Sequence, residues 1–90
     1  MRYAARVDKN QSEIVQALRD AGAYVWILGL PVDILVGYKG KTVLIEIKDG
    51  PKKRLTALQR DFFESWTGDT LCRVDGVEAA LRILKVIDES

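Results

Sequence analysis

The chain has 90 residues, a formal net charge of +1 and 48% hydrophobic residues. A chain of this length forms one domain with a small core, and its bulk charge predicts no class of partner, so any contact with nucleic acid must come from local clusters of charge. It has no histidine and one cysteine, Cys72. Intrachain disulfides and histidine-dependent catalysis are therefore excluded, zinc sites are disfavoured, and acid–base chemistry must come from carboxylates, lysine and tyrosine.

The beginning of the chain, Met1 to Lys9, is polar and charged, which predicts no signal peptide. No apolar run approaches the roughly 20 residues that span a bilayer. We therefore expect an intracellular, cytoplasmic protein without a membrane partner.

The first predicted helix covers residues 11–21. Asn10 and Glu13 have the spacing of a capping box, and Gly22 is suited to the end of the helix. Apolar residues then recur at helical spacing, at Ile14, Ala17, Leu18 and Ala21.

Three strands are predicted next. Residues 24–28 form a continuous apolar run, typical of a strand that is covered on both faces. Residues 32–38 and 41–48 are rich in β-branched side chains and flank a tight turn at Lys39-Gly40. The last two strands should therefore form an antiparallel hairpin.

A basic loop at residues 52–54 follows the hairpin, and a helix follows the loop. Thr56 and Gln59 have capping-box spacing, and this helix should run to Trp66 or Thr67 before Gly68.

A short strand at residues 70–74 precedes the last helix, for which Asp75 and Glu78 form another potential capping box and which should end near Ile87 or Asp88. The predicted order is αβββαβα, an α/β fold in which helices cover both faces of a mixed four-stranded sheet, all within one domain spanning residues 1–90.

Three polar residues of the hairpin carry the chemistry. Because strand side chains alternate, Glu46 and Lys48 should share one face, with Ile45 and Ile47 on the other. Asp33 opens the preceding strand. Two carboxylates can hold a hard divalent cation, and a lysine can orient an attacking water for phosphodiester hydrolysis. The alternative is a solvated strand face with a chance ion pair.

The order of elements and these residues resemble the PD-(D/E)xK nuclease superfamily, and more narrowly the compact stand-alone members of the VRR-NUC family. Residues 29–38 (GLPVDILVGY), 44–50 (LIEIKDG) and 54–59 (RLTALQ) carry the likeness, which spans nearly the whole chain together with Glu13. One departure is visible: Val32 separates Pro31 from Asp33, where the family joins the two directly. The aspartate still opens the strand, so we expect only the turn to differ.

The resemblance implies a restriction-endonuclease-like fold and a site that uses Mg²⁺ or Mn²⁺. Asp33, Glu46, the Ile47 backbone carbonyl and Glu13 would be metal ligands, Lys48 the catalytic lysine and Gln59 a further site residue. Glu13 and Gln59 each have a competing interpretation as the reciprocal partner of a helix cap.

Lys52, Lys53 and Arg54 lie beside this predicted site and would contact DNA phosphates, although such a run is often only a solvated loop. The predicted function is a structure-specific DNA endonuclease similar to Holliday-junction resolvases, with branched or junction DNA as its partner. The alternatives are a catalytically inactive nucleic-acid-binding module on the same fold and a purely structural small α/β protein.

Large apolar side chains exceed what a small core easily hides, which favours a homodimer. They are Trp26, Phe62, Phe63 and Trp66. Two active sites related by a two-fold axis would suit a four-way junction. The likeness to compact family members also suggests a phage or prophage origin.

Overall fold

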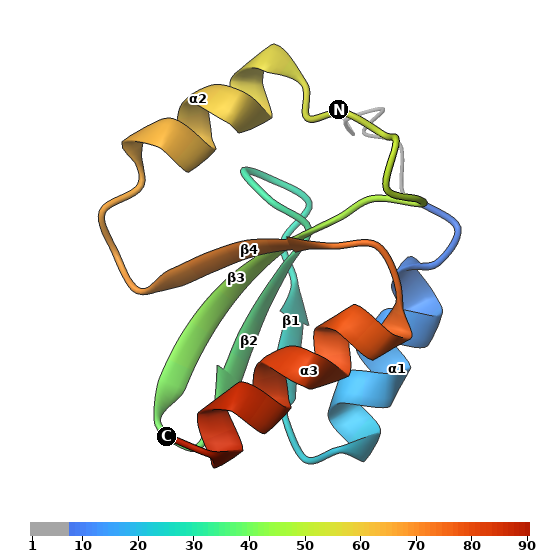
Figure 1. Ribbon diagram of the computed structural model, residues 1–90, viewed down its shortest axis with the longest axis vertical. Helices are drawn as coiled ribbons and strands as arrows, with labels where there is room; N and C mark the ends of the chain where they lie inside the picture. The colour runs from blue at the N-terminus through green and yellow to red at the C-terminus, as the bar shows by residue number, and fades with distance from the viewer. Residues whose placement is uncertain (1–7) are drawn as a thin grey trace.

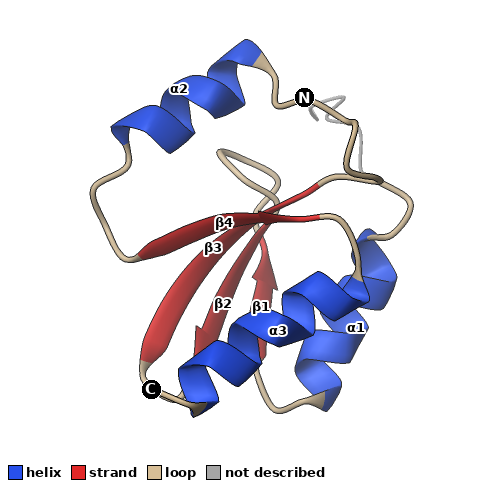
Figure 2. Cartoon of the chain, in the orientation of Figure 1, coloured by secondary structure: helices blue, strands red, loops and turns tan. Residues whose placement is uncertain are grey.

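The computed structural model describes residues 8–90, so Met1 to Val7, on which the absence of a signal peptide was predicted, lie outside the described residues. Seven elements follow one another in the predicted order αβββαβα (Figures 1 and 2). They are α1 (Gln11–Asp20), β1 (Tyr24–Ile27), β2 (Ile34–Tyr38), β3 (Lys41–Ile47), α2 (Ala57–Ser65), β4 (Thr70–Val74) and α3 (Val77–Asp88).

The four strands form one mixed sheet in the order β1-β2-β3-β4. Strand β2 is antiparallel to both of its neighbours, β1 and β3, and β4 runs parallel to β3. The predicted hairpin is confirmed, since Tyr38 pairs with Lys41 across a turn in which Lys39 and Gly40 both have positive φ, 50° and 81°. Two positive φ values are typical of the type I′ turn, whose twist matches that of the strands.

The core lies between one face of the sheet and the helices α1 and α3 (Figure 1). The sheet, α1 and α3 all contribute fully buried or nearly buried apolar side chains, among them Ile14, Leu18, Ile34, Val36, Ile45, Ile47, Ala80 and Leu84. Burying one such large aliphatic side chain stabilises the fold by roughly 1.5–3 kcal/mol. Helix α2 lies toward the opposite side of the sheet, and none of its residues is buried. The predicted α/β architecture with a helix-flanked mixed sheet is thus confirmed.

Strand β1 is not covered on both faces, and that prediction is wrong. It is the edge strand of the sheet, so only Val25 faces the core. Tyr24 and Trp26 point to the other face and are 62% and 57% exposed. An apolar run alone does not distinguish a central strand from an edge strand with exposed aromatic side chains.

The predicted capping box of α1 is also wrong, because Asn10 makes long-range contacts instead. Its side chain caps no helix N–H. Its Nδ2 donates to the carbonyl oxygens of Lys48, at 3.4 Å, and Asp75, at 3.1 Å. Asn10 is buried, and it joins the start of α1 to the end of β3 and to the turn before α3.

The predictions for the other helix ends have different outcomes. The Thr56–Gln59 capping box of α2 is confirmed, with both reciprocal hydrogen bonds present. The box predicted from Asp75 and Glu78 is wrong, since α3 begins at Val77 with Gly76 at its N-cap and no side-chain cap. At the end of α1, Gly22 has φ of 99° and donates to the carbonyl of Arg19, as a glycine after a helix often does.

Within residues 8–90, every helix is too short or too polar to cross a lipid bilayer.

Replacing Asn10 by alanine should lower the free energy of unfolding by about 1–3 kcal/mol, because two partly buried carbonyl groups lose a donor. Urea unfolding measures this. The exposed Ser12→Ala substitution on the same helix is the control and should change stability by less than about 0.5 kcal/mol. Equal stability of the two variants would show that Asn10 does not hold these segments together.

Candidate active site

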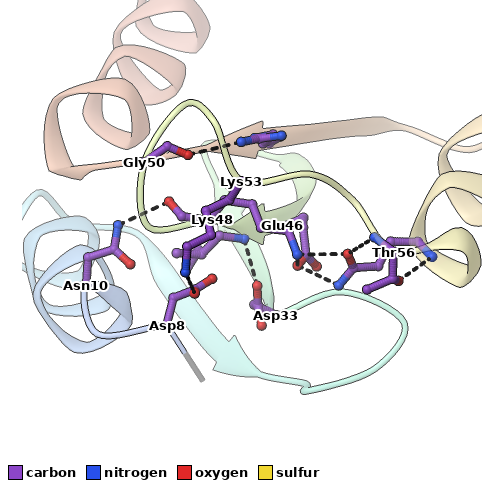
Figure 3. Close-up of polar contacts among 11 residues, drawn as sticks. Asp8, Asn10, Asp33, Glu46, Lys48, Gly50, Lys53 and Thr56 are labelled. Carbon is purple, nitrogen blue, oxygen red and sulfur yellow. Dashed lines mark hydrogen bonds and ion pairs between the residues drawn. The ribbon is translucent and has the colours of Figure 1, made fainter. Parts of the chain in front are cut away.

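The predicted polar residues of the hairpin converge at one end of the sheet. Asp33 precedes β2, Glu46 lies near the end of β3, Lys48 follows β3, and Gln59 lies in the first turn of α2. All four line one hollow of about 360 Å³. Figure 3 shows Asp33, Glu46 and Lys48 close together around it.

Strand alternation places Glu46 at this site. Ile45 and Ile47 are fully buried in the core, which confirms that Glu46 points to the opposite face. That face does not expose it to water, since Glu46 is only 2% exposed. A buried carboxylate is costly unless it is paired, protonated or bound to a cation.

Asp33 is fixed by hydrogen bonds to the backbone. Its Oδ2 accepts from the Ile47 N–H at 2.7 Å, and its own carbonyl accepts from the N–H groups of Leu28 and Gly29. Burial raises the pKa of Asp33, while the Ile47 hydrogen bond acts to lower it. The carboxylate of Asp33, just before β2, is thus fixed to the end of β3. A cis peptide bond between Leu30 and Pro31 precedes it in the chain.

Glu46 has one engaged and one free carboxylate oxygen. Oε2 accepts from Gln59 Nε2 at 2.8 Å and lies 3.5 Å from Lys48 Nζ. Oε1 is buried and has no hydrogen-bond partner among residues 8–90. Burial, and next the negative charge of Asp33, raise the pKa of Glu46 from 4.5 to about 7. The charge of Lys48 acts to lower the pKa of Glu46 and offsets these two effects only in part.

Gln59 connects the site to α2. Its Oε1 accepts from Lys48 Nζ and from the Thr56 N–H, both at 2.9 Å, while its Nε2 donates to Glu46. Its backbone N–H completes the capping box. The two interpretations of Gln59, helix cap and site residue, therefore hold together, because the amide oxygen can accept two hydrogen bonds.

Glu13 is not brought to this site. It is exposed in the first turn of α1 and does not line the hollow, so its position does not support the predicted role as a metal ligand. Asp8 lines the hollow instead (Figure 3). Its negative charge acts to raise the pKa of Asp33, and its Oδ1 lies 4.0 Å from Lys53 Nζ. The sequence analysis missed Asp8, which has no local motif around it.

The arrangement offers two neighbouring carboxylates rather than a larger acidic cluster. In the part of the chain from Asp8 onward, no three Asp, Glu or Cys side chains gather closely enough to hold a metal ion by themselves. A cation bound here would need Asp33, Glu46 and oxygen from backbone or water, as Mg²⁺ commonly has. Of the basic loop, Lys53 lines the hollow, whereas Lys52 and Arg54 do not.

Comparison with protein-family models, curated proteins and solved structures finds no match. The resemblance to VRR-NUC nucleases therefore stays a prediction from the sequence segments.

In the metal-free protein, Glu46→Gln should be more stable than the wild type at neutral pH. The folded-state pKa of about 7 exceeds the ordinary value of 4.5, so wild-type stability should fall as the pH rises between these values. The advantage of the variant should be absent below pH 4.5 and reach on the order of 3 kcal/mol above pH 7.

Urea unfolding in EDTA across this pH range measures the effect. Glu64→Gln on the exposed side of α2 is the matched control and should show no pH-dependent advantage. A constant difference between Glu46→Gln and wild type at all pH values would contradict the assigned cause.

Proposed function

We propose that the protein is a divalent-metal-dependent DNA endonuclease of the VRR-NUC family with a restriction-endonuclease-like topology. The observation that best supports this is the environment of Glu46, which is buried beside Asp33 with one oxygen unpaired. A site whose only task was structural would be more stable with a neutral residue there. Two adjacent carboxylates with a raised pKa are typical of functional sites.

The donor set fits Mg²⁺ or Mn²⁺, which prefer oxygen ligands. Asp33 and Glu46 would hold the ion, with the Ile47 carbonyl as a further ligand implied by the resemblance. When bound, such an ion polarises a phosphate and lowers the pKa of a coordinated water. Oε1 of Glu46 is buried and accepts no hydrogen bond from the described residues, so this oxygen is free to bind a cation.

Lys48 would orient the attacking water and offset negative charge on the phosphate oxygens as it develops. Its ammonium is held at the site by a hydrogen bond that Lys48 Nζ donates to Gln59 Oε1 at 2.9 Å. Gln59 also fixes Glu46 through its other amide group. Gln59 would therefore hold Lys48 and Glu46 at fixed positions relative to each other, without itself contacting the reacting atoms.

Assembly as a homodimer is part of the proposal, with branched or junction DNA as the substrate. Tyr24 and Trp26 form an exposed aromatic pair on the edge strand. A mainly apolar hollow, distinct from the active-site hollow, is lined by Leu30, Leu58 and Phe62 among others. Phe63 is half-buried, and the Trp66 ring packs 5.4 Å from Phe62. A partner subunit on this surface would bury apolar area that the single chain leaves in water.

Glu46→Gln should abolish saturable Mn²⁺ binding and lower DNA cleavage at least about 100-fold, because the neutral amide is a poor ligand. Lys48→Met should keep Mn²⁺ binding and lose cleavage to a similar degree. Calorimetric Mn²⁺ titration and a cleavage assay on linear, flapped and four-way-junction DNA measure both.

Glu64→Gln, an exposed acid on α2, is the control and should bind and cleave as the wild type does. A wild-type protein that binds DNA, but that does not bind Mn²⁺ and does not cleave DNA, would support the alternative, a catalytically inactive nucleic-acid-binding module. Unchanged Mn²⁺ binding in Glu46→Gln would place the metal elsewhere.

The protein should be a dimer at micromolar concentration, with a total interface of about 1,200 Å² or more. Trp26→Arg should dissociate it, because a charge would enter the apolar contact, and should reduce junction cleavage more than linear cleavage. Val86→Arg, an equally exposed apolar position on α3, is the control. Light scattering that reports a wild-type monomer with full junction cleavage would refute this assembly.

A further inference from the structure

A further hollow beside the proposed active site is lined by five positive side chains together with Pro51 and Leu55. Its volume is about 650 Å³, and no acidic residue lines it. We call it the basic groove, defined by Lys52, Lys53, Arg54, Arg60 and Arg73. Three of these come from the basic loop, whereas Arg60 lies on α2 and Arg73 on β4. The groove is therefore assembled from three separate segments of the chain.

The groove is continuous with the active-site hollow. Lys53 lines both of them. The two are joined again on α2, where Gln59 contacts Glu46 and Lys48 while its neighbour Arg60 lines the groove. A strand whose phosphate lay beside Glu46 would thus meet a positive surface on one side of that phosphate.

Most of the charge in the groove is unpaired. Lys52, Arg54 and Arg60 are exposed, and none of them forms an ion pair with a described residue. By contrast, Lys39 and Arg82, which lie away from the groove, pair with Asp88 and Glu78. Like charges crowded without counterions repel one another, and a polyanion relieves that repulsion.

The loop that forms one wall of the groove is held in shape by the sheet. Arg73 Nη2 donates to the carbonyl oxygens of Gly50 at 3.1 Å and Pro51 at 3.4 Å, and the bond to Gly50 is drawn in Figure 3. The Lys53 N–H donates back to Gly50. The positive side chains therefore project from a backbone that is already ordered, which lowers the entropic cost of binding.

We infer that the basic groove binds the sugar–phosphate backbone of the DNA strand on one side of the scissile phosphate, with Arg60 as a phosphate contact beyond the basic loop. This inference rests on the proposed nuclease function, because that function places the scissile phosphate at Glu46. Five of the side chains that line the groove are positive, and Pro51 and Leu55 complete it, so the groove matches the repeated negative charges of a phosphate chain.

Fluorescence anisotropy with labelled duplex and four-way-junction DNA, in EDTA so that no cleavage occurs, tests this. Arg60→Gln should weaken binding several-fold and reduce the slope of log affinity against log salt by roughly 0.9 on duplex DNA, one contact's worth of released counterions. Arg60→Lys should retain most of the affinity and slope. Arg82→Gln removes the same charge from α3 and should behave as the wild type.

Equal affinity and salt slope in Arg60→Gln and Arg82→Gln would overturn the inference. The two failures are distinguishable by Mn²⁺ binding and cleavage in the wild type. If both are present and Arg60→Gln has no effect, the groove inference fails and the nuclease proposal stands. If both are absent and Arg60→Gln still reduces the slope, the nuclease proposal fails and the groove is confirmed as a DNA contact of a binding module.

Discussion

Strand β3 must place Ile45 and Ile47 in the core, and the alternation of its side chains then forces Glu46 onto the other face, next to Asp33. Glu46 is nevertheless buried on that face, where its burial and the charge of Asp33 both raise its pKa. Lys48 and Gln59 offset the cost of this burial only in part, since one oxygen of Glu46 stays unpaired. The contact that α2 makes through Gln59 and the chemistry proposed for the site both depend on this one buried carboxyl group.

Polar contacts join α2 to the sheet, and its apolar packing is limited, since Phe62 and Phe63 are only half-buried. None of its residues is buried, yet Gln59 reaches both Glu46 and Lys48 while completing the cap with Thr56. One side chain thus fixes the start of a helix and the relative positions of Glu46 and Lys48. Local helix chemistry and site chemistry are coupled here, which explains why the sequence pattern supported both interpretations of Gln59.

Features set by local periodicity were predictable from the sequence, and features set by long-range contacts were not. The face of Glu46 follows from the two-residue repeat of a strand, and the cap at Gln59 from three-residue spacing. Asn10 also has the spacing of a helix cap, but its partners lie 38 and 65 residues away. No local pattern in the sequence indicates partners at such distances. Asp8 reaches the site through tertiary placement alone, and the exposure of Trp26 follows from the position of β1 at the sheet edge.

The loose attachment of α2 has a consequence for motion. A helix without buried side chains has a small free energy of local opening, so the amide hydrogens of α2 should exchange with solvent far sooner than those of β3, whose side chains Val43, Ile45 and Ile47 lie in the core. Each opening would withdraw Gln59 from Glu46 and Lys48 together, so the site would be lost and regained as a unit. The fraction of time for which Glu46, Lys48 and Gln59 are together in the arrangement described would then be set by this local equilibrium rather than by global unfolding.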